Sequence, residues 1–189
     1  MIIETIDGYL RDRQKDQRSK NCFHPSSLHK SAKTLYRHYL EGDNNQDFET
    51  RILRIFDNGH AVHDRLQAYL ENAGILLQAE VPVESKEYGI IGHTDGILLI
   101  GGVKGILEIK SMNANTFYST YEPKEEHLIQ VNIYMFCTGI DRAVLLYECK
   151  DDQALKEFYV KQDPGILNPV FEKIQHVREC LKNGKEPKR

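Results

Sequence analysis

Apolar and polar residues alternate with different periods along the chain, and the longest regular pattern lies between residues 48 and 72. Apolar side chains recur there at intervals of three, four and seven, the spacing of one face of an α-helix. Gly74 follows in a position suited to end the helix. The sequence therefore predicts a long amphipathic helix whose buried stripe consists of Ile52, Ile55, Phe56, Val62, Leu66 and Leu70.

Two further helices are predicted before this one. Residues 3–18 have the pattern of a polar helix that runs into a basic stretch over residues 11–20. Residues 23–40 predict a second helix, because Pro25 suits a first turn and the serines that follow it can cap one. The polar residues 42–47 predict a break before the long helix.

After Gly74 the pattern changes to that of strands. Residues 90–100 and 104–111 are joined by two glycines and predict a hairpin, preceded by a strand over 75–83. A helix is predicted over 125–138, strands over 142–149 and 155–161, and, after the turn at residues 163–165, a last amphipathic helix to about residue 181. This order predicts an α/β fold in which one mixed sheet is flanked by helices.

The length and composition fit one globular domain. The chain has 189 residues, 40% of them hydrophobic and 28% charged, which is enough apolar material for one core. We expect a single domain with a mainly helical part, a sheet with an inserted helix, and a C-terminal helix with a frayed polar tail, over residues 1–73, 75–161 and 164–189.

Charge and cysteine usage exclude few classes of function. The formal net charge is −3, so DNA binding would require basic residues gathered on one face. No apolar run is long enough for a signal peptide or a membrane span, which predicts a cytoplasmic protein without a membrane partner. The four cysteines, none within four residues of another, disfavour a compact zinc or iron–sulfur motif: Cys22, Cys137, Cys149 and Cys180.

The candidate chemistry lies on the predicted hairpin. Glu108 and Lys110 are two residues apart on a strand and so share a face, and the hairpin can bring Asp95 beside them. Two neighbouring carboxylates favour a hard divalent cation such as Mg²⁺ or Mn²⁺. Such a site suits phosphodiester hydrolysis, with the lysine stabilising developing negative charge. A Glu-x-Lys triplet alone is more often a solvated strand face with an ion pair.

Several motifs together resemble the PD-(D/E)XK nuclease superfamily. Asp95 within Gly92–Gly96, followed thirteen residues later by Glu108-Ile109-Lys110, resembles its signature. The match is most similar to the RecB-like branch, which includes CRISPR-associated RecB-like nucleases and phage exonucleases. It spans about residues 23–150, and four supporting segments lie at residues 23–28, 58–63, 92–96 and 130–134.

The resemblance implies a restriction-endonuclease-like sheet with an N-terminal helical wall, and it assigns roles to individual residues. It makes Asp95, Glu108, His63 and the Ile109 carbonyl ligands of Mg²⁺ or Mn²⁺, and Lys110 catalytic. Of the two histidines in this motif, we expect His60 to face solvent. Without a clustered cysteine trio the chain resembles a member that has no iron–sulfur cluster.

Other polar residues have both a functional and a plain structural interpretation. Gln130 and Tyr134 share a helical face and either assist catalysis or form a half-buried polar face. His127 and Tyr118 are candidates for the same cleft, and Glu80 either approaches the metal or His63 or is an exposed strand carboxylate. A DNA-phosphate site is predicted at Ser26, Ser27, Lys30, Lys33 and Arg37, with a solvated helix surface as the alternative.

The leading functional hypothesis is a metal-dependent exonuclease that processes DNA ends in recombination, repair or phage DNA metabolism, with a recombination or replication protein as a possible partner. A structure- or site-specific endonuclease is the second hypothesis. The third is a non-catalytic DNA-binding or assembly subunit that retains the fold, against which the complete Asp95, Glu108 and Lys110 set argues.

Overall fold

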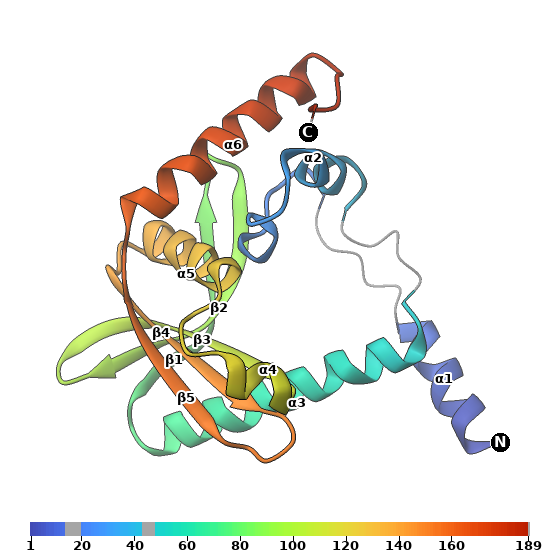
Figure 1. Cartoon of the computed structure of the whole chain (residues 1–189), viewed down its shortest axis with the longest axis vertical. Coiled ribbons are helices and arrows are strands. Elements are labelled where there is room, and N and C mark those ends of the chain that lie inside the picture. Colours follow the sequence, from blue (N-terminus) through green and yellow to red (C-terminus); the bar gives the residue numbers. More distant parts are fainter. Residues whose placement is uncertain (14–19, 43–47, 189) are drawn as a thin grey trace.

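The computed structural model describes residues 1–13, 20–42 and 48–188 (Figure 1). The expected basic stretch over 11–20 and the expected break over 42–47 lie partly outside these ranges. Within them the elements run in the order α1 (Ile2–Arg13), η1 (Pro25–Ser27), α2 (Ala32–Glu41), α3 (Thr50–Asn72), β1 (Leu76–Ser85), β2 (Ile90–Ile100), β3 (Val103–Met112), α4 (Ala114–Ser119), α5 (Glu125–Thr138), β4 (Arg142–Cys149), β5 (Leu155–Lys161) and α6 (Pro164–Lys182).

The five strands form one mixed sheet in the order β1-β2-β3-β4-β5. All neighbouring strands are antiparallel except β3 and β4, which are parallel and connected through α4 and α5. The predicted α/β architecture, a mixed sheet flanked by helices, is confirmed. The strands over 90–100, 142–149 and 155–161 and the helix over 125–138 have the predicted bounds.

The sheet opens between its second and third strands. Pairing of β2 with β3 runs from the hairpin turn to Gly96 opposite Leu107 and stops there. Beyond this point the first half of β2 pairs with β1, whereas the second half of β3 pairs with β4. The strands therefore part at a fork, with Asp95 on one arm and Glu108 on the other.

Helices cover both faces of the sheet. Val62 and Leu66 of α3 pack on Leu107 and Ile109 of β3, whose side chains point away from those of Glu108 and Lys110. The opposite face packs against α4 and α5, with Val131 and Met135 of α5 fully buried. A third cluster joins η1, α2 and α6 to the outer side of α5, and α2 and α6 lie side by side at one end of the molecule (Figure 1).

The predicted apolar stripe of α3 is only partly buried. Leu66 is 2% exposed, whereas Ile55 and Phe56 are 38% and 45% exposed, which contradicts their predicted burial. Figure 1 shows the reason: the N-terminal half of α3 extends past the sheet toward α1, and only the C-terminal half crosses the strands. Helical periodicity identifies an apolar face but does not show what covers it.

The predicted helix over 23–40 is wrong as a single element. The chain forms the short turn η1 and then α2, whose N-cap is Ser31, with its hydroxyl accepting the Thr34 amide hydrogen at 3.2 Å. Ser26 and Ser27 belong to η1 and cap no α-helix, so the expected helix N-terminus at these serines does not exist. Phe23 instead forms a bridge to Ile90, which ties this segment to the sheet.

Three smaller differences remain. Helix α4 was not predicted, and α6 begins at Pro164, within the residues 163–165 that were predicted as a turn. The C-terminal tail is not frayed at Glu186, whose carboxylate pairs with Lys33 at 3.2 Å and Arg37 at 2.5 Å on α2. Among the described helices, none combines the length and hydropathy needed to cross a membrane.

Candidate active site

Asp95 sits at the fork, where its side chain replaces the missing strand pairing. The Ile109 amide donates a hydrogen bond to Asp95 Oδ2 at 2.5 Å, and the neighbouring Thr94 hydroxyl donates to the Leu107 carbonyl at 2.8 Å. On the other side of β2, Gly96 allows β1 to approach closely, because a Cβ there would lie 2.8 Å from the Gln78 carbonyl oxygen. The Gly-x-x-Asp-Gly segment is therefore built to hold an acid at the point where two strands separate.

His63 reaches Asp95 from α3. Its Nδ1 lies 3.3 Å from Asp95 Oδ1, the carboxylate oxygen that is not bonded to Ile109. Burial lowers the pKa of His63, but the hydrogen bond and charge of Asp95 outweigh it, so the pKa is raised overall. His60, one turn earlier, is exposed as expected.

Glu108 and Lys110 form a buried ion pair beside Asp95. The Lys110 ammonium lies 2.7 Å from Glu108 Oε1, and the Glu108 side chain is only 2% exposed. Burial, reinforced by the negative charge of Asp95, raises the pKa of Glu108 to about 7. Burial opposes the charge on Lys110, yet the neighbouring Glu108 raises the Lys110 pKa, which keeps the amine protonated. The pair alternates on β3 with apolar residues, as the sequence predicts.

One oxygen of Glu108 has no partner. Among the described residues, Glu108 Oε2 is buried and makes no hydrogen bond, an arrangement that is costly unless another group binds there. No group of three or more His, Cys, Asp or Glu side chains in the described chain is already arranged to hold a metal ion. The donor types nevertheless fit a hard divalent cation: Glu108 Oε2, Asp95 Oδ1 and the His63 imidazole.

Gln67 belongs to the site, although the sequence analysis did not identify it. It lies one helical turn after His63, is 8% exposed, and donates from Nε2 to the Asp95 carbonyl oxygen and to Glu80 Oε1, both at 2.8 Å. The spacing of four from His63 was the available signal, since it places both side chains on one face of α3. Glu80 is an exposed strand residue, as the plain structural interpretation expected, and among the described residues its carboxylate contacts Gln67 rather than His63.

Gln130 and Tyr134 share a face of α5, as predicted, and both are buried. Gln130 Nε2 donates to the Tyr134 hydroxyl at 2.9 Å, so each supplies the other with a partner. His127, one turn earlier, contacts the buried Tyr147 hydroxyl through Nδ1 at 2.7 Å. Burial and the charge of Lys110 lower the His127 pKa to about 3, so this imidazole is neutral. Tyr118 instead bonds to Asp152 on the loop between β4 and β5.

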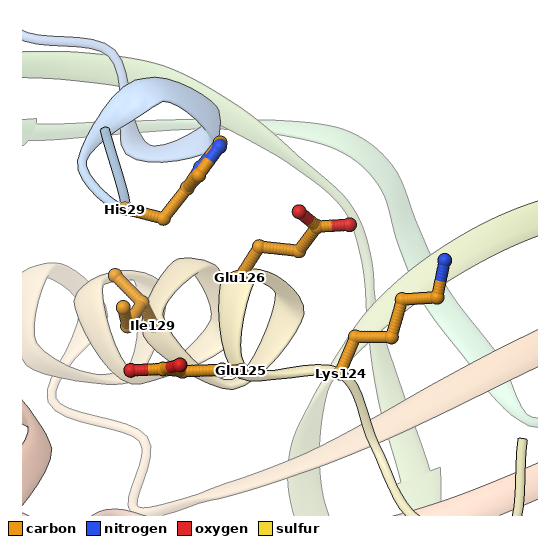
Figure 2. A pocket seen from close by; sticks show the side chains of 5 residues that line it. All are labelled: His29, Lys124, Glu125, Glu126 and Ile129. Carbon is orange, nitrogen blue, oxygen red and sulfur yellow. The ribbon is translucent and has the colours of Figure 1, made fainter. Parts of the chain in front are cut away.

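A cavity of about 390 Å³ lies between the loop after η1 and the first turn of α5. It is lined by His29, Lys124, Glu125, Glu126 and Ile129, and Figure 2 shows Lys124 and Glu126 extending to the same side of the helix. Glu126 contributes to the electrostatic environment of Lys110, and Lys110 and His29 to that of His127. The cavity thus neighbours the fork without containing any of the predicted catalytic side chains.

The predicted DNA-binding residues are not one basic face. Lys33 and Arg37 both pair with Glu186, and Ser27 is buried. The backbone carbonyls of Leu28 and Lys30 accept hydrogen bonds from Lys173 of α6, at 2.8 and 3.0 Å. The segment from Ser26 to Lys30 is therefore fixed against α6, and DNA contact by these five residues remains a prediction.

A partly buried ion pair also connects α3 to the sheet two residues after His63. Arg65 donates from Nη2 to both carboxylate oxygens of Glu148, at 2.8 and 2.7 Å. Glu148 lies on β4, and its side chain is 2% exposed, whereas that of Arg65 is 36% exposed. This contact, which the sequence analysis missed, holds the part of α3 that carries His63 and Gln67 against the central strands.

The sequence matches no protein-family model, and no curated protein matches it. Solved structures do share its fold. An alkaline exonuclease, LHK-Exo from Laribacter hongkongensis, aligns with a TM-score of 0.62 and 16% identity over 96% of this chain and 93% of that chain. A phage-related exonuclease from Haemophilus somnus 129PT aligns with a TM-score of 0.64 and 14% identity over 85% of this chain and 93% of that chain.

A third structure, of the protein SSO0001, aligns with a TM-score of 0.64 and 16% identity over 95% of this chain and 86% of that chain. LHK-Exo is also known in complex with dAMP, and that complex gives a TM-score of 0.62 at 18% identity. The chain therefore has the fold of alkaline and phage-related exonucleases, the restriction-endonuclease-like architecture expected from its motifs.

Proposed function

We propose that this protein is a metal-dependent DNA nuclease whose centre consists of His63, Asp95, Glu108 and Lys110. One observation supports this more than any other: the buried, unpartnered Glu108 Oε2 beside Asp95 and a protonated lysine. A buried carboxylate that leaves one oxygen without a partner beside a second acid does not stabilise the fold, because each acid disfavours ionisation of the other. It is a good arrangement for binding a cation.

The chain's own residues divide into those that bind and those that stabilise charge. Asp95, Glu108 and His63 would hold Mg²⁺ or Mn²⁺, with the Ile109 carbonyl as a further oxygen. When bound, the ion would polarise a phosphoryl oxygen and lower the pKa of a water molecule. Lys110, kept protonated by Glu108, would stabilise the negative charge that develops on the phosphate in the transition state.

Gln130 and Tyr134 are proposed to assist from α5. Their mutual hydrogen bond fixes the Tyr134 hydroxyl and the Gln130 amide on the face of α5 that is buried against the sheet. Either group could orient the attacking water, support Lys110 or contact a phosphate. Both contributions would be smaller than that of Lys110, because neither residue carries charge.

Within this proposal, the favoured activity is exonucleolytic processing of DNA ends, of the kind implied by the resemblance to the RecB-like branch. This activity would serve recombination, repair or phage DNA metabolism. The exonuclease fold neighbours support it at the level of architecture, and the dAMP complex of LHK-Exo is consistent with a DNA substrate. For such an activity, a recombination or replication protein would be the natural partner.

The test is digestion of end-labelled linear single- and double-stranded DNA with Mn²⁺ or Mg²⁺, beside closed circular DNA of the same sequence. We expect release of short products from the linear DNA alone and none in the presence of a chelator. Cleavage of the circle would instead indicate the endonuclease alternative. Equal products from wild type and Asp95→Ala would contradict catalysis at this site and favour a non-catalytic DNA-binding role.

A further inference from the structure

Glu80 has an unusual backbone conformation at a defined place. Its φ is +48°, a left-handed value that L-residues other than asparagine and aspartate rarely adopt because it strains the backbone. In the β1–β2 pairing Ala79 faces Gly96 and Val81 faces Thr94, so Glu80 lies across from Asp95. Strain of this kind persists only where surrounding contacts hold it, and it concentrates at functional sites.

The contact that holds Glu80 is the carboxamide of Gln67. Nε2 of this buried side chain donates to Glu80 Oε1 and to the Asp95 carbonyl oxygen, both at 2.8 Å. A primary amide has two N–H groups, and these two bonds use both of them. Gln67 thus joins three elements: α3, the strained residue of β1 and the backbone of Asp95.

We propose that Gln67 and Glu80 are positioning residues for Asp95, an inference that rests on the proposed nuclease function. Gln67 fixes the Asp95 backbone relative to α3, the helix that also carries His63. The spacing between the imidazole and the carboxylate is therefore set by one rigid element. Glu80 holds the Gln67 amide in the orientation that reaches Asp95, and its left-handed backbone directs its carboxylate there.

A direct role for Glu80 gives a different prediction. As a metal ligand or general base, Glu80 would need its negative charge, whereas as a hydrogen-bond acceptor it needs only an oxygen. Glu80→Gln retains that oxygen and removes the charge. Glu80→Ala removes both, and Gln67→Leu removes the amide with little change in size. Glu84→Ala, on the same strand and exposed, is the matched control.

For the positioning pair we expect Gln67→Leu and Glu80→Ala to lower Mn²⁺-dependent kcat by roughly 10–100-fold, the usual effect of removing a group that orients a metal ligand. Glu80→Gln should stay within about threefold of wild type, and so should Glu84→Ala. Loss of activity in Glu80→Gln equal to that in Glu80→Ala would overturn the proposal. So would full activity in Gln67→Leu.

Glycine at position 80 separates positioning from stability. Because glycine adopts a φ of +48° without strain, Glu80→Gly should melt at a higher temperature than Glu80→Ala. Its kcat should nevertheless be as low as that of Glu80→Ala. Wild-type kcat in Glu80→Gly would show that backbone strain, and not the carboxylate, caused the loss.

A readout without activity keeps this inference distinct from the proposed function. The Ile109 amide donates to Asp95 Oδ2, so its hydrogen exchange in chelator reports the position of Asp95. We expect exchange about tenfold faster in Gln67→Leu and Glu80→Ala, and at the wild-type rate in Glu80→Gln. Unchanged exchange in all variants would overturn the positioning role, whereas an inactive wild type with this exchange pattern would overturn only the nuclease proposal.

Discussion

Strands β3 and β5 carry the same kinds of residue and use them in opposite ways. On β3, Glu108 and Lys110 are paired at 2.7 Å in the middle of the sheet, and Glu108 is 2% exposed. On β5, every second residue is exposed, including Glu157 and Lys161. Tyr159 between them is 68% exposed, and its hydroxyl donates to Glu157 at 3.3 Å.

The difference arises from the position of each strand in the sheet. In the sheet formed by the described residues, β5 is an edge strand with β4 as its only neighbour, and solvent hydrates its charged face. β3 lies between β2 and β4 and is covered by helices, so its carboxylate loses hydration and its pKa rises to about 7. Alternating acid and lysine residues therefore indicate a reactive site only where the fold removes water from them.

The largest expected contrast is in catalysis. Lys110→Ala should lower kcat by about 10²–10³-fold, the usual cost of removing one donor that stabilises transition-state charge. Lys161→Ala, the matched change on the edge strand, should leave kcat within about twofold of wild type because surface substitutions away from a site are nearly neutral. Single-turnover digestion of end-labelled DNA measures both, and similar rates for the two variants would remove the distinction between the strands.

The next contrast concerns pH and stability in metal-free protein. Because the folded pKa of Glu108 is about 7 against an ordinary value of 4.5, the folded state holds this proton more tightly. The resulting stabilisation is complete below about pH 4.5 and is lost as pH rises through 7. Glu108→Gln carries no such proton, so its melting temperature relative to wild type should increase by several degrees between pH 5 and pH 8.

Thermal unfolding in chelator at a series of pH values checks this prediction. The informative quantity is how the difference in melting temperature between Glu108→Gln and wild type changes with pH. The size of that difference at any one pH also reflects the changed contact with Lys110. Glu157→Gln, at an exposed position on β5, is the matched control measured beside it. Parallel curves for Glu108→Gln and wild type would mean that Glu108 is ionised throughout the range.

A smaller contrast involves β4, another interior strand. Arg65→Ala leaves the buried Glu148 carboxylate without the Nη2 group that donates to both of its oxygens, and should reduce the free energy of unfolding by about 2 kcal/mol. That is less than the roughly 3–5 kcal/mol of a fully buried pair, because Arg65 is 36% exposed. Glu157→Ala should change stability by less than about 0.5 kcal/mol. Denaturant unfolding compares the two, and an equal cost would contradict the central-versus-edge interpretation.

Much of the sheet could be predicted because its signals are local. Strand periodicity and the glycine pair at the hairpin predict the strands over 90–100 and 104–111, and the apolar residues Leu128, Ile129, Ile133 and Phe136 predict the helix over 125–138. These patterns also placed Asp95 beside Glu108 and Lys110. They did not show that pairing stops at Gly96, because the fork depends on long-range contacts of β2 with β1 and of β3 with β4.

The incorrect and missing predictions share one cause: a local sequence pattern does not show which distant residues a segment will contact. Pro25 and the serines after it could begin a helix, but the bridge from Phe23 to Ile90 holds this segment against the sheet. Helix α2 therefore begins only after its N-cap, Ser31. Phe56 continues the apolar period of α3 beyond the end of the sheet. Gln67 looked like an ordinary helix residue because its two acceptors lie 13 and 28 residues away in the sequence.

The most direct test of the catalytic centre is to locate the cation itself. Crystals soaked in Mn²⁺ should give an anomalous difference peak at the fork, about 2.0–2.3 Å from oxygens of Asp95 and Glu108, with the His63 imidazole turned toward it. Crystals of Asp95→Ala should lack the peak. Mn²⁺ bound elsewhere, in a protein whose Mn²⁺-dependent cleavage survives the Asp95→Ala substitution, would contradict the account.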